Sequence, residues 1–149
     1  MDVGITSRIH AGLVARPVFE DDYVAVLPEG HALSGQASLS LGQLDGQRML
    51  QSGGGCETLI EELLASAAST PEIVCLVRDN ATLASMVREG LGLTIMPELA
   101  LPADRAGLVV LPLNPRLRRT LHLLTGPPDA PGPVVMAFAV VARGVVSPL

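Results

Sequence analysis

The chain of 149 residues carries a formal net charge of −5 and has an isoelectric point near 5.0, and this length allows one ordinary domain or two small lobes. It contains ten basic residues, all of them arginine, and this acidic balance excludes an extended basic face for nucleic acid. Apolar residues make up 48% of the sequence and aromatic residues only 2%, so the core must consist of aliphatic side chains.

Extended segments dominate the first part of the chain. Asp2–Ile5 has the pattern of a short buried strand. The acidic cluster Glu20–Asp22 indicates a solvated turn, and the apolar run Tyr23–Leu27 predicts a strand that a loop follows. We place His31 in that loop, with a structural hydrogen bond as its expected role.

A glycine run lies between a strand and a helix in the next segment. A Ser-capped helical turn is expected around Leu41–Leu44, followed by a short strand that ends near Gln51. Three glycines, Gly53–Gly55, come directly after it. From Glu57 onward, leucine and isoleucine recur at helical spacing, which predicts about three helical turns that end before Ser69.

The middle of the chain has a strand, helix, strand order. Ile73–Val77 is a continuous apolar run, which is typical of a strand covered on both faces. Asp79 or Asn80 can cap the following helix, and Gly90 fits its left-handed C-terminal position. Because Gly92–Pro97 returns at once as another strand, we expect a βαβ unit with parallel strands.

The last third alternates strands and loops before a final helix. Leu108–Leu111 and Thr120–Thr125 predict two further strands. The proline-rich stretch at 126–133 is a linker, and apolar spacing over 134–145 predicts a helix. The element order as a whole predicts an α/β fold.

The cysteines and the hydropathy of the sequence further limit the kind of protein that this chain can be. Cys56 and Cys75 form no CxxC pair and have no clustered histidines, so we expect reduced thiols and no metal site. The N-terminal residues lack the pattern of a secretory signal, and Arg143 interrupts the longest apolar stretch. We therefore expect a cytoplasmic protein with no membrane segment and no cofactor.

Three ordered segments of the sequence carry a family resemblance. DNATLASMVREGLGLTIMP, Asp79–Pro97, resembles the cap, helix and strand of the effector-binding domain of LysR-type transcriptional regulators. DVGIT, Asp2–Thr6, is similar to a strand of that domain, and LVARPVFEDDYVAVLPEGHALSG, Leu13–Gly35, is similar to the stretch after it. Together these matches cover nearly the whole chain.

The resemblance implies a periplasmic-binding-protein-like (type 2) regulatory domain with one complete subdomain and part of the other. Subdomain two would occupy about 47–111, and about 1–46 and 112–149 would supply the crossovers, strands and final helix of subdomain one. Family members also carry a DNA-binding winged helix-turn-helix, which has no counterpart in this sequence. Such domains pair side by side, so a homodimer is expected, with the second helix and Ile73–Val77 as contributors.

The glycine run allows three chemical interpretations. A phosphate loop is excluded because it requires lysine, which the chain lacks. A Cys56 nucleophile would benefit from the helix N-terminus, but no histidine can be placed beside it as a base. Exposed N–H groups at a helix start bind carboxylates or phosphates without a basic side chain, and the residues alone leave this possibility open beside a simple surface turn.

The family resemblance assigns the glycine loop, which follows the strand predicted to end near Gln51, to the effector cleft. By the same correspondence, the strand ends and helix starts nearby become candidate effector-binding residues, although a strand-end turn and an ordinary helix cap explain some of them equally well. Glu98, next to Pro97, shares this position. The candidate residues are Thr6, Ser7, Ser52, Gly53, Gly54, Gly55, Cys56, Asn80, Ala81, Thr82 and Pro97.

The sequence thus predicts a non-enzymatic, effector-sensing domain that binds a small anionic metabolite between two lobes. DNA contact is expected only through a domain absent from this sequence. Two alternatives stay open from sequence: a solute-binding protein of a transporter, and a small hydrolase or transferase that uses Cys56.

Overall fold

The computed structural model describes residues 3–9, 11–126, 137, 140 and 141, and it divides the chain into two compact units. Unit 1 contains residues 1–21 and 118–149, and unit 2 contains residues 22–117. These bounds differ from the subdomain boundaries predicted near 46/47 and 111/112, because unit 2 also contains the segments 22–46 and 112–117. The reason is packing, because Leu27, Leu39 and Leu113 are all buried in the core of unit 2. Assignment of the units to the two family subdomains stays a prediction.

Unit 1 is built on an antiparallel strand pair. Strand β1 (Val3–Thr6) pairs with strand β6 (Leu108–Thr125) in a register that runs from Val3 opposite Thr125 to Thr6 opposite His122. The strand predicted near the start is confirmed, but its burial is not, since Ile5 is 56% exposed. The predicted proline-rich linker and final helix lie mainly outside the described residues.

Two long strands pass through both units. Strand β2 (Val14–Pro28) and β6 are hydrogen-bonded neighbours in the sheet order β1-β6-β2-β5. The predicted turn at Glu20–Asp22 is therefore wrong, because these residues continue β2 and pair with arginines of β6. The two strands predicted at 108–111 and 120–125 are likewise parts of one strand.

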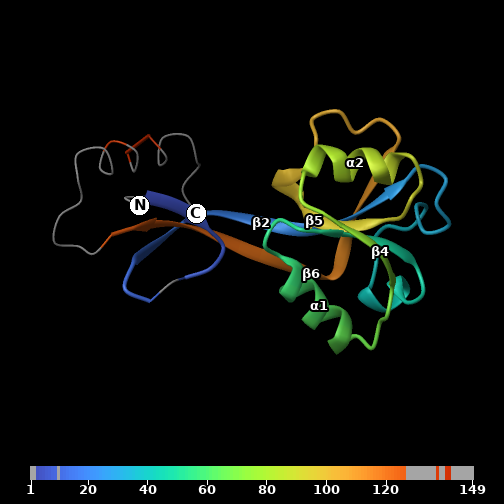
Figure 1. Ribbon diagram of the computed structural model, residues 1–149, viewed down its shortest axis with the longest axis horizontal. Helices are drawn as coiled ribbons and strands as arrows, with labels where there is room; N and C mark the ends of the chain where they lie inside the picture. Colours follow the sequence, from blue (N-terminus) through green and yellow to red (C-terminus); the bar gives the residue numbers. More distant parts are fainter. Residues whose placement is uncertain (1–2, 10, 127–136, 138–139, 142–149) are drawn as a thin grey trace. The chain divides into compact units, whose positions relative to one another are not determined.

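Unit 2 is an α/β layer whose elements follow the predicted order (Figure 1). These elements are η1 (Leu41–Leu44), β3 (Arg48–Ser52), α1 (Glu57–Ser66), β4 (Glu72–Val77), α2 (Asn80–Arg88), β5 (Thr94–Pro97) and η2 (Glu98–Ala100).

The strands of unit 2 form one layer in the order β4-β3-β5-β2-β6. Strands β3 and β4 are parallel, and the backbone N–H of Leu50 donates to the carbonyl of Leu93 at 2.8 Å, which joins β3 to the residue before β5. The bridge between Met49 and Leu93 is also parallel, so the expected βαβ unit with parallel strands is confirmed. Strand β2 continues the layer antiparallel to β5, and β6, whose residues 108–117 belong to unit 2, follows β2 in the sheet order.

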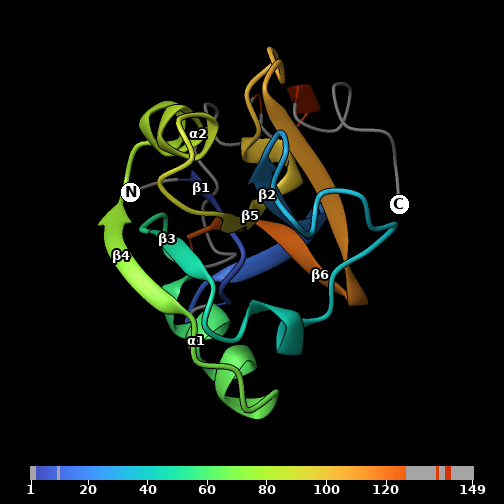
Figure 2. The ribbon, with the colours of Figure 1, turned by 90° about the vertical axis from the view of Figure 1, so that its right-hand side faces the viewer.

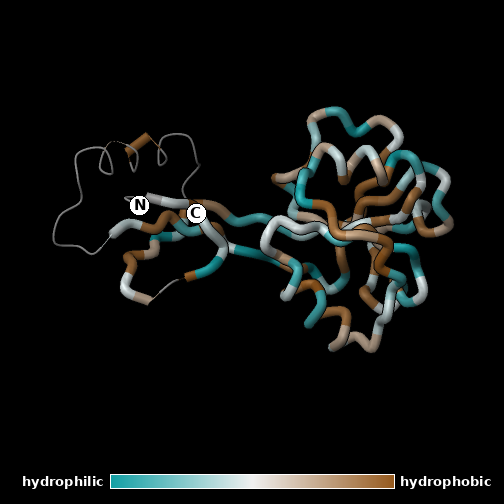
Figure 3. The backbone as a smooth tube through the Cα atoms, in the orientation of Figure 1, coloured by the Kyte–Doolittle hydropathy of each residue, from teal (hydrophilic) through white to brown (hydrophobic). Residues whose placement is uncertain are grey.

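The two helices cover opposite faces of this layer, as Figures 1 and 2 show. Ile60 of α1 packs in a cluster with Met49 of β3, whereas Leu83 of α2 packs in a second cluster with Leu50. Met49 and Leu50 are adjacent in β3, so they point to opposite faces. Apolar segments concentrate along these strands in Figure 3, and no helix among the described residues is long and apolar enough to cross a membrane.

Strand β4 lies at the edge of the layer and is less covered than predicted. Ile73 is 46% exposed and Leu76 is 47% exposed, so the prediction of cover on both faces is wrong for the chain by itself. The register also skips one residue of β4, since Met49 is opposite Ile73 and Leu50 is opposite Cys75, and this extra residue interrupts the alternation of faces along β4.

Candidate effector site

The carboxyl ends of the parallel strands bring most predicted site residues to one edge of unit 2. Ser52 at the end of β3 is in register with Val77 at the end of β4. The backbone N–H of Gly53 then donates to the carbonyl of Val77 at 2.8 Å. Residues that follow the two strands therefore leave the sheet side by side. Ligands of open α/β sheets bind outside the carboxyl ends of the strands, where adjacent connections go to opposite faces, and β3 and β4 lead into α1 and α2 in this way.

The three glycines of the loop differ in whether the structure would accept a side chain at their positions. A β-carbon added at Gly53 would lie 2.8 Å from Cγ of Arg78, so the arginine side chain lies across this glycine. Gly55 has a φ of +93°, which disfavours any side chain. At Gly54 the space is open, with only Oγ of Ser52 at 3.9 Å from an added β-carbon.

The N-terminus of α1 has no side-chain cap. Cys56 is the N-cap residue, and its side chain makes no capping hydrogen bond. Unpaired N–H groups at such a helix start carry partial positive charge and attract anions. The glycine-to-helix junction therefore has the electrostatics of an anion site.

The N-terminus of α2 is different because a carboxylate already occupies it. Oδ2 of Asp79 accepts a hydrogen bond from the backbone N–H of Thr82 at 2.7 Å. Hydrogen bonds from the Thr82 hydroxyl and then its N–H hold the pKa of Asp79 below its ordinary value of 3.8. The predicted cap is thus confirmed. An anion at Asn80–Thr82 would meet a negative charge, so this helix start is the weaker half of the site.

The remaining predicted residues have local roles. Thr6 Oγ1 accepts a hydrogen bond from the N–H of Arg8 at 3.0 Å, which is a strand-end turn, and Ser7 is exposed. Both belong to unit 1, so their participation in the site stays a prediction. Pro97 is buried at the end of β5 and precedes η2. His31 Nδ1 accepts from the N–H of Leu33, which is the structural hydrogen bond expected there.

The structure gives Cys56 a packing role. The residue is 5% exposed, packs in the cluster with Met49 and Ile60, and its Sγ lies 3.8 Å from the carbonyl oxygen of Ser52. Cys75 and Cys56 are not joined in a disulfide. Among the described residues no group of histidine, cysteine or acidic side chains is suited to hold a metal ion.

Sequence reasoning missed Arg78 as a neighbour of the glycine run. Its guanidinium makes no ion pair with another described residue, and its side chain packs along Gly53. The signal that could have found it is the parallel register, since the residues after Ser52 and Val77 must lie together once β3 and β4 are paired.

Comparison with known proteins agrees with the fold and defines the class. The family model of the LysR substrate binding domain matches residues 1–146. The chain therefore belongs to the LysR substrate-binding-domain family, and it is a regulatory, non-enzymatic domain with the periplasmic-binding-protein-like type 2 fold.

Two proteins with similar sequences are helix-turn-helix transcriptional regulators. The chain is 28% identical over 128 residues to the HTH-type transcriptional regulator YvbU of Bacillus subtilis, an alignment that covers 79% of this chain and 44% of that protein. It is 30% identical over 112 residues to YbhD of Escherichia coli, which covers 72% of this chain and 35% of that protein. The chain thus spans less than half the length of these relatives.

Solved structures show the same fold. The regulatory domain of CcmR from Synechocystis PCC6803 in complex with 2-PG superposes with a TM-score of 0.87 at 15% identity, over 99% of this chain and 74% of that one. The effector-binding domain of QuiR in complex with shikimate has a TM-score of 0.83 at 24% identity, over 97% and 71% of the two chains.

Proposed function

We propose that the chain is the effector-sensing domain of a LysR-type transcriptional regulator in the cytoplasm, and that it binds a small anionic metabolite. The observation that carries the anion is the uncapped N-terminus of α1 behind the open backbone of Gly54. Arg78, whose side chain lies across the neighbouring Gly53, adds a positively charged residue to the same loop. Shikimate, bound by the QuiR domain, is itself a carboxylate.

The regulator would contact DNA through a part outside this sequence. The net charge of −5 leaves this chain unsuited to phosphate contacts, and the relatives that it matches are longer and are HTH-type regulators. Effector binding regulates such a protein only if the effector has different affinities for two arrangements of the domain.

We also propose a homodimer in which the edge strand β4 contributes to the interface. Its Ile73 and Leu76 are 46% and 47% exposed, and β3 is its only strand partner among the described residues. An edge of this kind favours pairing with another chain.

The test of the anion site uses a substitution pair at Gly54, where a side chain fits and only the charge differs. A thermal-shift and calorimetric screen would compare shikimate, other small carboxylates and inorganic phosphate with neutral amide analogues. For the best anionic ligand, Gly54→Asp should raise Kd roughly tenfold or more because of repulsion at close range. Gly54→Asn should stay within about threefold of the parent. Equal effects of the two substitutions, or none, would contradict the proposed site.

A further inference from the structure

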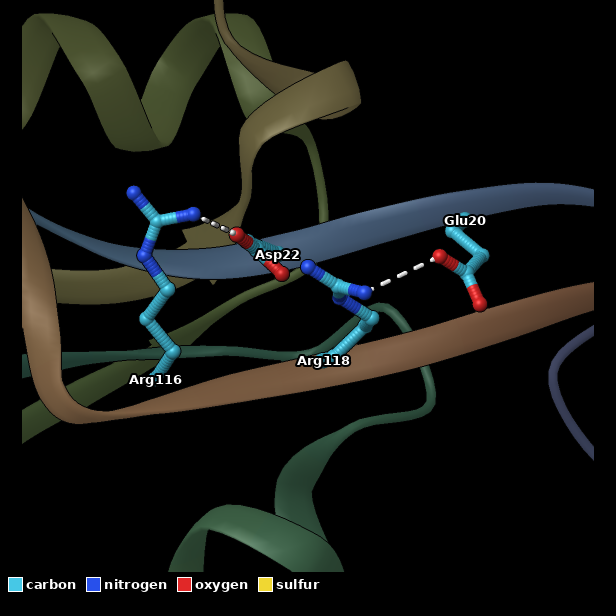
Figure 4. A network of polar contacts seen from close by, with 4 residues as sticks. All are labelled: Glu20, Asp22, Arg116 and Arg118. Atoms are coloured by element: carbon cyan, nitrogen blue, oxygen red, sulfur yellow. Dashed lines mark hydrogen bonds and ion pairs between the residues drawn. The ribbon is translucent and has the colours of Figure 1, made fainter. Parts of the chain in front are cut away.

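An ion-pair ladder lies where the chain passes from one unit to the other. Unit 1 ends at Asp21 and resumes at Arg118, so the described chain crosses between units only within β2 and β6. Three consecutive acidic residues of β2 pair there with three arginines of β6, and Figure 4 shows the two pairs on one face. The pairs are Glu20 with Arg118, Asp21 with Arg119 and Asp22 with Arg116.

The central pair is buried. The side chain of Asp21 is only 2% exposed and that of Arg119 is 20% exposed. Nε and Nη2 of Arg119 both donate to Oδ2 of Asp21, at 3.0 and 2.6 Å. Two charge-assisted hydrogen bonds from one guanidinium thus converge on a single carboxylate oxygen, which fixes the position of the Arg119 side chain against Asp21.

The outer pairs lie on the opposite face of the strands, as alternation along a strand requires. Arg118 is 3.1 Å from Glu20 and Arg116 is 3.5 Å from Asp22, and the arginine side chains are 56% and 69% exposed. Exposed pairs of this kind contribute little to stability. A buried pair is also a weak source of stability, because apolar side chains of similar volume often do as well.

The place of these ion pairs in the chain is therefore more informative than their contribution to stability. The ladder occupies both crossings at once, with pairs on both faces of the strands, and a sequence that needed only stability could place apolar residues there. We propose that the ladder is a latch that holds β2 and β6 in one backbone geometry and so restricts how far the two units move relative to each other.

The experiment separates this role from stability. Spin labels on Arg16→Cys in unit 1 and Glu62→Cys in unit 2, both exposed positions, would report the distance distribution between units. Cys75→Ser removes a competing thiol. The variant Asp21→Leu/Arg119→Met replaces the buried pair by apolar groups. We expect its denaturant midpoint to match or exceed that of the labelled parent, while its distance distribution becomes clearly broader.

A control and a second variant keep the test decisive. Arg88→Met breaks the bond from Arg88 to the carbonyl of Ala106 inside unit 2 and should leave the distribution unchanged. Arg116→Gln/Arg118→Gln alters only exposed side chains, so it will fold even if the apolar variant does not, and it should also broaden the distribution. Unchanged distributions in the ladder variants that fold, or equal broadening in Arg88→Met, would overturn the latch.

Discussion

The carboxylate of Asp79 links the start of α2 to pH. Its pKa lies below the ordinary value because Thr82 donates two hydrogen bonds to the ionised form. A group with a lowered folded-state pKa contributes stability above the unfolded-state pKa and loses it as the pH falls through the folded-state pKa. The cap of α2 is therefore fully effective near neutral pH and weakens in acid.

The variant Asp79→Asn tests this dependence. Asparagine is an equally good N-cap but cannot be protonated in this range. We expect a variant of similar stability at neutral pH whose denaturant midpoint falls less than that of the parent between about pH 5 and pH 3. Glu62→Gln on the exposed face of α1 is the matched charge control. Full acid sensitivity in Asp79→Asn would show that the cap is not responsible.

Asp45 adds a second acid-sensitive contact elsewhere in unit 2. The backbone N–H of Thr70 and then its hydroxyl donate to Oδ1 of Asp45, both at 2.8 Å, and these bonds lower the pKa of Asp45. The contact ties the segment before β3 to the segment before β4. Some acid sensitivity should therefore persist in Asp79→Asn.

Strand β3 is the element on which both faces of unit 2 depend. Met49 and Leu50 are fully buried on opposite faces, one under α1 and the other under α2. Leu76 on the neighbouring strand is 47% exposed. Leucine thus occurs at a central position of the layer, as Leu50, and at an edge position, as Leu76.

A pair of alanine substitutions compares the two positions. Leu50→Ala should lower the free energy of unfolding by about 2–5 kcal/mol, because it leaves a cavity in a packed core. Leu76→Ala should change it by less than about 1 kcal/mol. Urea unfolding followed by circular dichroism measures both. Similar losses in the two variants would contradict the edge position of β4.

The sequence predicted correctly those helices and strands whose bounds depend on residues close together in the chain. The Asp79 cap, the left-handed Gly90 with its φ of +78° and the apolar face of α1 are short-range features, and α1, α2 and β5 appear where they were expected. The errors involve partners far along the chain. Glu20–Asp22 has the composition of a solvated turn, but it forms part of a strand because arginines of β6 pair with all three carboxylates. The exposure of β4 depends on which strand lies at the edge of the sheet, which the sequence of β4 alone does not show.

The same division applies to the candidate site. Sequence spacing placed the glycine run at a helix start, and the structure confirms that location. It did not reveal that Arg78 lies across Gly53, because that contact depends on the pairing of β3 with β4. Nor did it distinguish the uncapped start of α1 from the carboxylate-capped start of α2 as a place for an anion.

For the whole molecule, self-association is the first property to measure. If β4 contributes to a homodimer, Leu76→Glu should shift the chain toward monomer in sedimentation equilibrium, because it places a charge in an apolar contact. Leu13→Glu, at a 41% exposed position in unit 1, is the matched control and should leave the association unchanged. A parent chain that is monomeric, or a Leu76→Glu variant that dimerises normally, would refute the interface.

If the start of α1 holds a small anion, chemical-shift mapping will locate it directly. The ¹⁵N-labelled chain would be titrated with the tightest carboxylate or phosphate from the screen. We predict the largest amide shifts at Gly54, Gly55 and Glu57, with smaller changes at Asn80–Thr82, where Asp79 already caps the helix. Saturation with no change at 53–58, or changes confined to other segments, would show that the anion does not bind at the start of α1.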